Sequence, residues 1–303
     1  MSGNNISCVR QSNELAYRCL LRRSSHQSSI LSGSSSTSTR MQRGFAFTKL
    51  ADRLTSIAEL SDDDLELLTR MSYTIGHFGS HDHVLRKGDQ PSNCCLLLQG
   101  YLCWKDPGSG QITSIYVPGD VPDLHTVAAS QLGAHLTALG PVVVAFVPRG
   151  FFHDISLQSE GLARAIRHLD MAETACLRNW IINLGSRDSL ARVAHLICEI
   201  TVRLRAVGLS HDHRLPSPFT QSDLAAACAI SPVHANRIIQ ELRRRRALQW
   251  QSRMITISDW RMLVHLARFE PDYLGLRHVT EFARSEPAPP ISPEDAPTFS
   301  VSS

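Results

Sequence analysis

The sequence predicts an α+β fold with three parts: an antiparallel β-roll, a long dimerisation helix, and a small, basic C-terminal domain of helices and one hairpin. Short apolar runs separated by glycines predict the roll between about residues 72 and 147, and helical spacing returns near residue 160. The charge also changes sign along the chain. Residues 44–150 hold seven basic and eleven acidic residues, whereas residues 187–268 hold thirteen Arg and six acids. An acidic part before a basic part indicates a sensor joined to a polyanion-binding domain.

The composition excludes several classes of protein. The chain has 303 residues, 43% of them hydrophobic, which is enough for two domains with proper cores. No apolar run reaches the roughly 18 residues that a membrane helix needs, and the N-terminus lacks the apolar segment of a secretory signal. The eight Cys include no Cys-x-x-Cys pair and no zinc-finger spacing. We therefore expect a cytoplasmic protein with reduced thiols and no membrane partner.

Both ends of the chain have the composition of loose tails. Residues 1–43 contain twelve Ser, six Arg and one acid, so we expect a disordered extension. The same composition resembles an organelle transit peptide, and a start at Met41 is a further alternative. Residues 275–303 carry five Pro after residue 285 and are expected to form a flexible tail.

The sensor domain is expected over residues 44–154. Helical spacing covers residues 45–70, and Ser61 followed by three Asp predicts a helix N-cap within that stretch. The strand-like runs after it are Val84-Leu85, Cys95 to Leu98, Tyr101 to Trp104, Ile112 to Val117, and Val142 to Val147. Turn glycines at positions 88, 100, 110 and 119 separate these runs, which is typical of an antiparallel roll or barrel.

A connecting helix is expected over residues 155–186. Its apolar positions at helical spacing are Leu162, Ile166, Leu169 and Cys176. This stripe either packs back on the roll or pairs with the same helix of a second subunit. The spacing alone slightly favours packing within the chain, whereas the family resemblance given below implies that these four residues form a dimer contact.

The C-terminal domain, residues 187–274, contains the most specific pattern. A helix over residues 187–207 ends near Gly208. Thr220 and Asp223 form a capping-box pattern at the start of an Ala-rich helix. Ser231 then caps a second helix that begins at Pro232. Two short helices joined in this way predict a helix-turn-helix whose second helix enters the DNA major groove.

Residues after the second helix strengthen the DNA-binding interpretation. Ile255 and Ile257 alternate after a turn, which predicts a two-stranded wing with Arg253 at its tip near a phosphate. Arg243 to Arg246 supply four adjacent positive charges for sequence-independent attraction to DNA. Within the second helix, Arg237 is suited to guanine and Asn236 to adenine.

From about Phe45 to Leu274 the sequence resembles the Crp/Fnr family of bacterial transcription regulators. The specific segments are Leu224 through Leu242, Ile255 through Trp260, and Phe269 through Leu274. The resemblance implies a cyclic-nucleotide-binding-like roll and a homodimer on a palindromic operator, with double-stranded DNA and RNA polymerase as partners. It also implies that Pro232, Val233 and Arg237 face bases, and that His234 and Asn236 contact bases or phosphates. Thr220 and Gln221 are implied to lie near the DNA backbone. The predicted DNA-binding residues are Thr220, Gln221, Ser231, Pro232, Val233, His234, Asn236, Arg237 and Arg253.

Two departures from the family pattern matter. Ala229 stands where the family often has Gly, and a positive φ at Ala costs on the order of 1 kcal/mol. The family's cyclic-nucleotide cassette uses a Glu for the ribose and an Arg for the phosphate. The comparable segment here is Gly119 to Leu124, in which Asp123 could replace that Glu, and no Arg occurs between Arg86 and Arg149. We therefore expect no response to cAMP, because a buried phosphate without a counter-charge is costly.

Other functions remain as alternatives. The roll could bind a cyclic nucleotide, a metal or haem that gates DNA binding, and His77, His81 and His83 form the sharpest metal-like cluster. Cys94 and Cys95 point to opposite faces of a strand, and Cys103 could neighbour them across a hairpin in a redox site. A cupin-like metal oxygenase and a nucleotide-binding adaptor are further alternatives. Neither explains the basic domain, so we expect no enzyme, no cofactor and no metal, and the effector-binding residues stay unknown.

Overall fold

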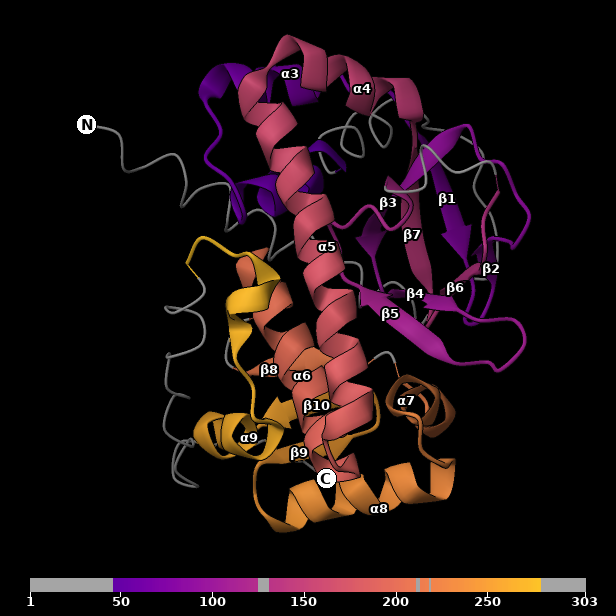
Figure 1. Ribbon diagram of the computed structural model, residues 1–303, viewed down its shortest axis with the longest axis vertical. Helices are drawn as coiled ribbons and strands as arrows, with labels where there is room; N and C mark the ends of the chain where they lie inside the picture. The colour runs from indigo at the N-terminus through magenta and orange to yellow at the C-terminus, as the bar shows by residue number, and fades with distance from the viewer. Residues whose placement is uncertain (1–45, 125–130, 211–212, 218, 279–303) are drawn as a thin grey trace, which may run out of the picture. The chain divides into compact units, whose positions relative to one another are not determined.

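The computed structural model describes residues 46–124, 131–210, 213–217 and 219–278 (Figure 1). The predicted extension over residues 1–43 lies outside this range, as does the tail beyond residue 278. The first described helix covers residues 46–55. Helix α3 (Asp62–Thr69) follows, and the predicted cap at Ser61 is present as a complete capping box with Asp64.

Two antiparallel sheets form the predicted roll. In the described part of the roll the strands are β1 (Thr74–Phe78), β2 (His83–Leu85), β3 (Asn93–Gln99), β4 (Leu102–Lys105), β5 (Ile112–Tyr116), β6 (His135–Ala138) and β7 (Val142–Pro148). Their order is β1-β7-β3 in one sheet and β2-β6-β4-β5 in the other. The sequence pattern missed β1 and β6, because both are short and interrupt their apolar residues with polar ones or glycine.

Strand β3 is buried on both faces, which explains its continuous apolar run. Cys95 and Leu97 pack between the two sheets. Cys94 and Leu96 lie on the opposite face, in the core shared with the helices. The predicted opposite orientation of the two adjacent cysteines is therefore confirmed.

The connection after the roll consists of two helices, α4 (Arg149–Gln158) and α5 (Glu160–Ser186). Ser159 separates them because its backbone is extended, with φ of −138°, and its side chain accepts a hydrogen bond from the Leu162 amide to cap α5. The expected boundary at residue 155 thus falls inside α4. Helix α5 packs against β5, α6 and the segment after α9.

The C-terminal part has the predicted winged helix-turn-helix architecture (Figure 1). Its elements are α6 (Ser189–Ala206), β8 (Arg214–Pro216), α7 (Gln221–Cys228), α8 (Pro232–Arg244), β9 (Leu248–Gln251), β10 (Met254–Ile257), α9 (Trp260–Ala267) and the 3-10 helix η2 (Pro271–Leu274). The wing has a third strand that the sequence did not predict. Strand β8 pairs with the outer edge of β10.

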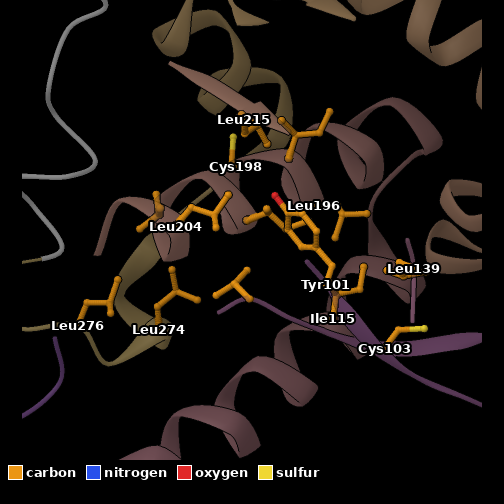
Figure 2. Close-up of a cluster of buried hydrophobic side chains, with 14 of the residues drawn as sticks. Tyr101, Cys103, Ile115, Leu139, Leu196, Cys198, Leu204, Leu215, Leu274 and Leu276 are labelled. Carbon is orange, nitrogen blue, oxygen red and sulfur yellow. The ribbon is translucent and has the colours of Figure 1, made fainter. Parts of the chain in front are cut away.

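One hydrophobic core extends from the roll into the C-terminal helices. Figure 2 draws Tyr101 and Ile115 of the roll in one cluster with Leu196 of α6. The hydroxyl of Tyr101 also donates a hydrogen bond of 2.8 Å to the carbonyl oxygen of Pro216. The roll and the C-terminal helices therefore bury apolar surface against each other. Among the described residues, no helix combines the length and the apolar character that crossing a membrane requires.

Candidate nucleic-acid interface

The turn between α7 and α8 is built by local hydrogen bonds, as predicted. The Thr220 hydroxyl and the Asp223 carboxylate cap α7 reciprocally, and the Ser231 hydroxyl accepts from the His234 amide to cap α8. Pro232 occupies the first turn of α8, where no amide donor is lost. Ala229 adopts φ of 50° and ψ of 50°, so this alanine does take the left-handed conformation.

Helix α8 has one buried and one exposed side. Ala235, Ile238 and Leu242 are buried, and the helix contacts α6, α7 and β9. The opposite side carries Val233, Asn236 and Arg237, all of which are exposed. These positions are three and four residues apart, so their side chains share one helix face. The recognition helix therefore presents a continuous, solvent-accessible face.

The remaining predicted DNA-binding residues differ in what their side chains do. Gln221 and Arg253 are exposed, and Arg253 follows Ser252, which has φ of 53°, in the turn between β9 and β10. Thr220 and Ser231 are exposed too, but their hydroxyls are engaged in helix capping. Their side chains thus hold the turn in shape, and His234 is half-buried beside them.

The predicted cluster of four arginines is partly neutralised by one acid. Both carboxylate oxygens of Glu241 accept hydrogen bonds from Arg244, at 2.7 and 2.8 Å, and one accepts from Arg245 at 2.6 Å. These contacts hold the pKa of Glu241 at about 2. Arg244 and Arg245 therefore offer less net charge to a polyanion than the sequence alone indicates.

Asp120 is the buried charge centre that the sequence analysis missed. Its carboxylate accepts from Arg53 at 2.8 Å and from Arg203 of α6 at 2.7 Å. Burial alone would raise the pKa of Asp120, but the charges of Arg203 and Arg53 outweigh it, so the pKa lies below its ordinary value. The preceding Gly119 has φ of +100°, and a side chain there would meet the Lys49 carbonyl oxygen at 2.8 Å. The chain can therefore approach the 46–55 helix closely at this point.

The arginines at this centre come from outside the strands. The absence of Arg between residues 86 and 149 led us to expect no guanidinium that could hold a buried phosphate, and the two that the structure places beside the roll come from helix 46–55 and α6. Both are used by Asp120, and Arg203 also donates to the Ile115 carbonyl oxygen at 2.7 Å. A pocket of about 40 Å³ adjoins them between β5, α5 and α6.

Asp123, which could replace the ribose-binding Glu of the family, points into the protein. It is fully buried, and one carboxylate oxygen accepts from the Cys95 amide at 2.8 Å. The neighbouring Pro122 carbonyl oxygen accepts from the Trp104 indole at 3.2 Å. Residues 125–130 of the same segment lie outside the described part of the chain.

The candidate metal and redox clusters do not assemble. The His81 imidazole lies 3.7 Å from Asp223, whereas His83 stacks on His135 with ring centroids 4.4 Å apart. His77 is exposed on β1, and no group of three potential metal ligands occurs among the described residues. Cys103 does not face Cys94 across a hairpin, because β3 and β4 belong to different sheets.

Burial also makes these thiols unreactive. It raises the pKa of Cys94 to about 12 and that of Cys103 to about 12, and it raises the pKa of Cys95 further above its usual value. Since the thiolate is the reactive form, the geometry does not support the redox alternative.

The four residues assigned to a dimer contact lie on the inner side of α5. Leu162 and Leu169 are buried in the core of the same chain, and Ile166 and Cys176 pack against that core. A different apolar group is exposed on α5. Met171, Ile181 and Ile182 are 68%, 72% and 53% exposed, respectively. Leu162, Ile166, Leu169 and Cys176 thus pack within the same chain, as the alternative to a dimer contact predicted. Met171, Ile181 and Ile182 are exposed and available to a partner.

Comparisons with known proteins point to the same family. A model of the Crp-like helix-turn-helix domain matches residues 191–266. An anaerobic regulatory protein of Haemophilus influenzae is 24% identical over 162 residues, which are 53% of this chain and 62% of that protein. One from Aggregatibacter actinomycetemcomitans is 24% identical over 188 residues, 61% of this chain and 72% of the relative. The chain therefore matches less than two thirds of the length of the first relative.

The fold is shared with solved structures. FixK2 from Bradyrhizobium japonicum superimposes with a TM-score of 0.57 at 18% identity, and the match covers 64% of this chain and 97% of that one. This match covers 64% of the chain, far more than the family model over residues 191–266, so the similarity of fold extends beyond the helix-turn-helix. The chain thus contains a Crp-like helix-turn-helix domain at residues 191–266, and its fold is similar to that of FixK2.

Proposed function

We propose that the protein is a sequence-specific DNA-binding regulator that acts as a homodimer on a palindromic operator without responding to cAMP. The observation that carries this proposal is the exposed face of α8, on which Asn236 and Arg237 share one side of a capped helix. Members of the family regulate transcription, and we propose no catalytic role. The domain bounds proposed are residues 44–154, 155–186 and 187–274.

The chemistry of the face fits the major groove. The Arg237 guanidinium matches the two acceptors of guanine, and the Asn236 amide matches adenine. Gln221 at the start of α7 and Arg253 in the wing are exposed and suit phosphate contacts, which set the register of the helix. RNA polymerase at the promoter and the cytoplasm as location are parts of the same proposal.

The dimer contact is proposed on the outer side of α5. Met171, Arg178 and Ile182 are seven and four residues apart, which places them on one face, and the exposed Ile181 lies beside it. That spacing is the one by which two helices pair in a coiled coil. A second copy of the chain is the proposed occupant, because a palindromic operator needs two recognition helices related by a two-fold axis.

Oligomeric state tests this contact. Ile182→Glu would bury a charge in the pairing face, so analytical ultracentrifugation should find a monomer at concentrations where the wild type is a dimer. Met262→Glu, on the exposed side of α9, is the matched control and should remain dimeric. A dimeric Ile182→Glu protein would contradict the proposed contact.

The lack of a cAMP response is proposed from the charges beside the roll. Arg53 and Arg203 both pair with Asp120, and Asp123 is buried against β3. A cyclic phosphate would have to displace Asp120 from both guanidinium groups. Titration calorimetry should find no heat of cAMP binding, and saturable binding would favour the alternative of a ligand-gated regulator.

Genome-wide mapping of bound DNA, followed by affinity measurements on the recovered sites, tests the main proposal. Arg237→Ala should weaken specific binding by roughly 1–3 kcal/mol if it reads a guanine, while non-specific binding changes little. Arg86→Ala removes an exposed charge from the roll and is the matched control. An unchanged footprint for Arg237→Ala would contradict the assignment of α8 as the reading helix.

A further inference from the structure

One apolar side chain stands on the exposed face of the recognition helix. Val233 is 67% exposed, although the polar side chains of Asn236, Arg237 and Gln240 surround it on the same face. Single exposed apolar residues are common on protein surfaces, so exposure alone decides nothing. The position of Val233 is more informative than its exposure. It lies in the first turn of α8, and this is the part of a recognition helix that contacts base edges.

The valine is also held rigidly. Ser231 caps the helix through the His234 amide at 3.2 Å, and Pro232 fixes the backbone immediately before it. A β-branched side chain in a helix has one strongly preferred rotamer. Val233 therefore presents its two methyl groups in a fixed direction and loses little conformational entropy when it makes a contact.

The chemistry of the major groove offers one apolar partner for such a group. Each base pair presents donors and acceptors there, and the C5 methyl of thymine is the apolar feature of the pattern. The positive charges around Val233 favour DNA as the partner that contacts it. Arg237 lies one helical turn away, and the positive end of the helix dipole lies at Pro232.

We propose that Val233 is a specificity-determining residue that packs on the C5 methyl of a thymine in each operator half-site. The proposal rests on the proposed function and adds to it a chemical feature of the operator. Four residues of helix rise about 6 Å, and base pairs are about 3.4 Å apart. The thymine therefore lies within about two base pairs of the guanine that Arg237 reads.

The test replaces thymine by deoxyuridine, which removes only the methyl group. In an operator recovered by genomic mapping, each thymine of both half-sites is replaced in turn, and fluorescence anisotropy at constant salt gives the affinity of the full-length protein. We expect one position near the Arg237 contact at which the affinity falls about fourfold per half-site, the value for burial of one methyl group. At thymines outside the reach of Val233, any change in affinity caused by deoxyuridine should be the same whether residue 233 is valine or alanine.

Val233→Ala provides the second arm of the test. It should weaken binding to the thymine operator and be insensitive to deoxyuridine at the same position, so that the two changes are not additive. Alanine suits a helix, and thermal unfolding verifies that the variant is folded. Met262→Ala removes an exposed apolar side chain from α9 and should keep the full sensitivity of the wild type.

The outcomes separate this inference from the function on which it rests. If the wild type selects an operator but no deoxyuridine position depends on residue 233, the thymine contact is wrong and the regulator assignment stands. If the wild type selects no operator at all, the proposed function is wrong and the thymine contact falls with it.

Discussion

Replacement of Asp120 by Asn should destabilise the fold more than any surface charge change. Asp120 is 4% exposed, and its carboxylate neutralises Arg53 and Arg203, whose side chains are each 10% exposed. Asn keeps the size and an oxygen that can accept from the Val117 amide, but it leaves two buried guanidinium groups without this counter-charge. Breaking a buried ion pair by removing one partner costs about 3–5 kcal/mol.

The structure indicates the lower end of that range. Arg203 keeps Glu199 at 3.3 Å and the Ile115 carbonyl oxygen, and Arg53 keeps the Ser56 hydroxyl at 3.2 Å. We therefore expect a loss of about 3 kcal/mol in the free energy of unfolding, which lowers Tm by about 6–12 °C in a chain of this size. Urea and thermal unfolding followed by circular dichroism measure both quantities at pH 7.

The pH dependence adds a second readout. The pKa of Asp120 in the folded protein lies below its ordinary value of 3.8, so its contribution to stability is present above that value and is lost as pH falls through the folded pKa. The difference between wild type and Asp120→Asn should therefore shrink in acid. Asp63→Asn, an exposed acid in the first turn of α3, is the control and should cost only a few tenths of a kcal/mol. A loss below about 1 kcal/mol for Asp120→Asn would refute the reasoning from buried charge.

Three further predictions concern the C-terminal helices. Ala229→Gly should stabilise the protein by about 1 kcal/mol, because Ala229 holds φ of 50°. Thermal unfolding should show a higher Tm, and an unchanged or lower Tm would contradict this reasoning. His195 is 1% exposed, neither ring nitrogen has a hydrogen-bond partner, and burial followed by the charge of Arg187 lowers its pKa to about 3. Because the unfolded chain protonates this histidine more readily, it destabilises the fold as pH falls from about 6.5 towards 3 and has no such effect above that range. His195→Leu should therefore remove about 2 kcal/mol of acid destabilisation at pH 5. If the free energy of unfolding fell equally with pH in both proteins, this prediction would be contradicted. Glu241→Gln should release Arg244 and Arg245, and binding to non-specific DNA should then become tighter and fall more steeply with salt; an unchanged salt slope would mean that neither arginine reaches a phosphate.

Local signals in the sequence predicted the helix-turn-helix well. The predicted caps at Thr220 and Ser231 and the proline at position 232 involve residues within a few positions of one another. Each cap or turn constrains the backbone through its own hydrogen bonds, so the sequence contains the whole signal. Strands β1, β6 and β8 lack such signals, because long-range pairing stabilises them more than intrinsic preference does.

The inner face of α5 could not be chosen from periodicity. One apolar group includes Leu162 and Leu169, and another includes Met171 and Ile182, and both have helical spacing. Periodicity identifies a face but not the surface against which it packs. The roll and α6 occupy the first face, and only the packed structure contains that information.

The roll has no Arg between residues 86 and 149, and its buried Asp120 is paired with arginines from helices outside the roll. Asp120 lies between β5 and β6, and its guanidinium partners come from helices 67 positions before it and 83 positions after it. Glu199 extends the network, since it accepts from Arg203, from the Trp180 indole at 3.3 Å and from the Tyr273 hydroxyl at 2.7 Å. A charge that is satisfied only by distant segments stabilises their docking rather than the roll alone. Asp120→Asn should therefore accelerate amide hydrogen exchange in α6 more than in β3, and uniform acceleration across both would mean that the roll itself, and not its contact with α6, depends on this carboxylate.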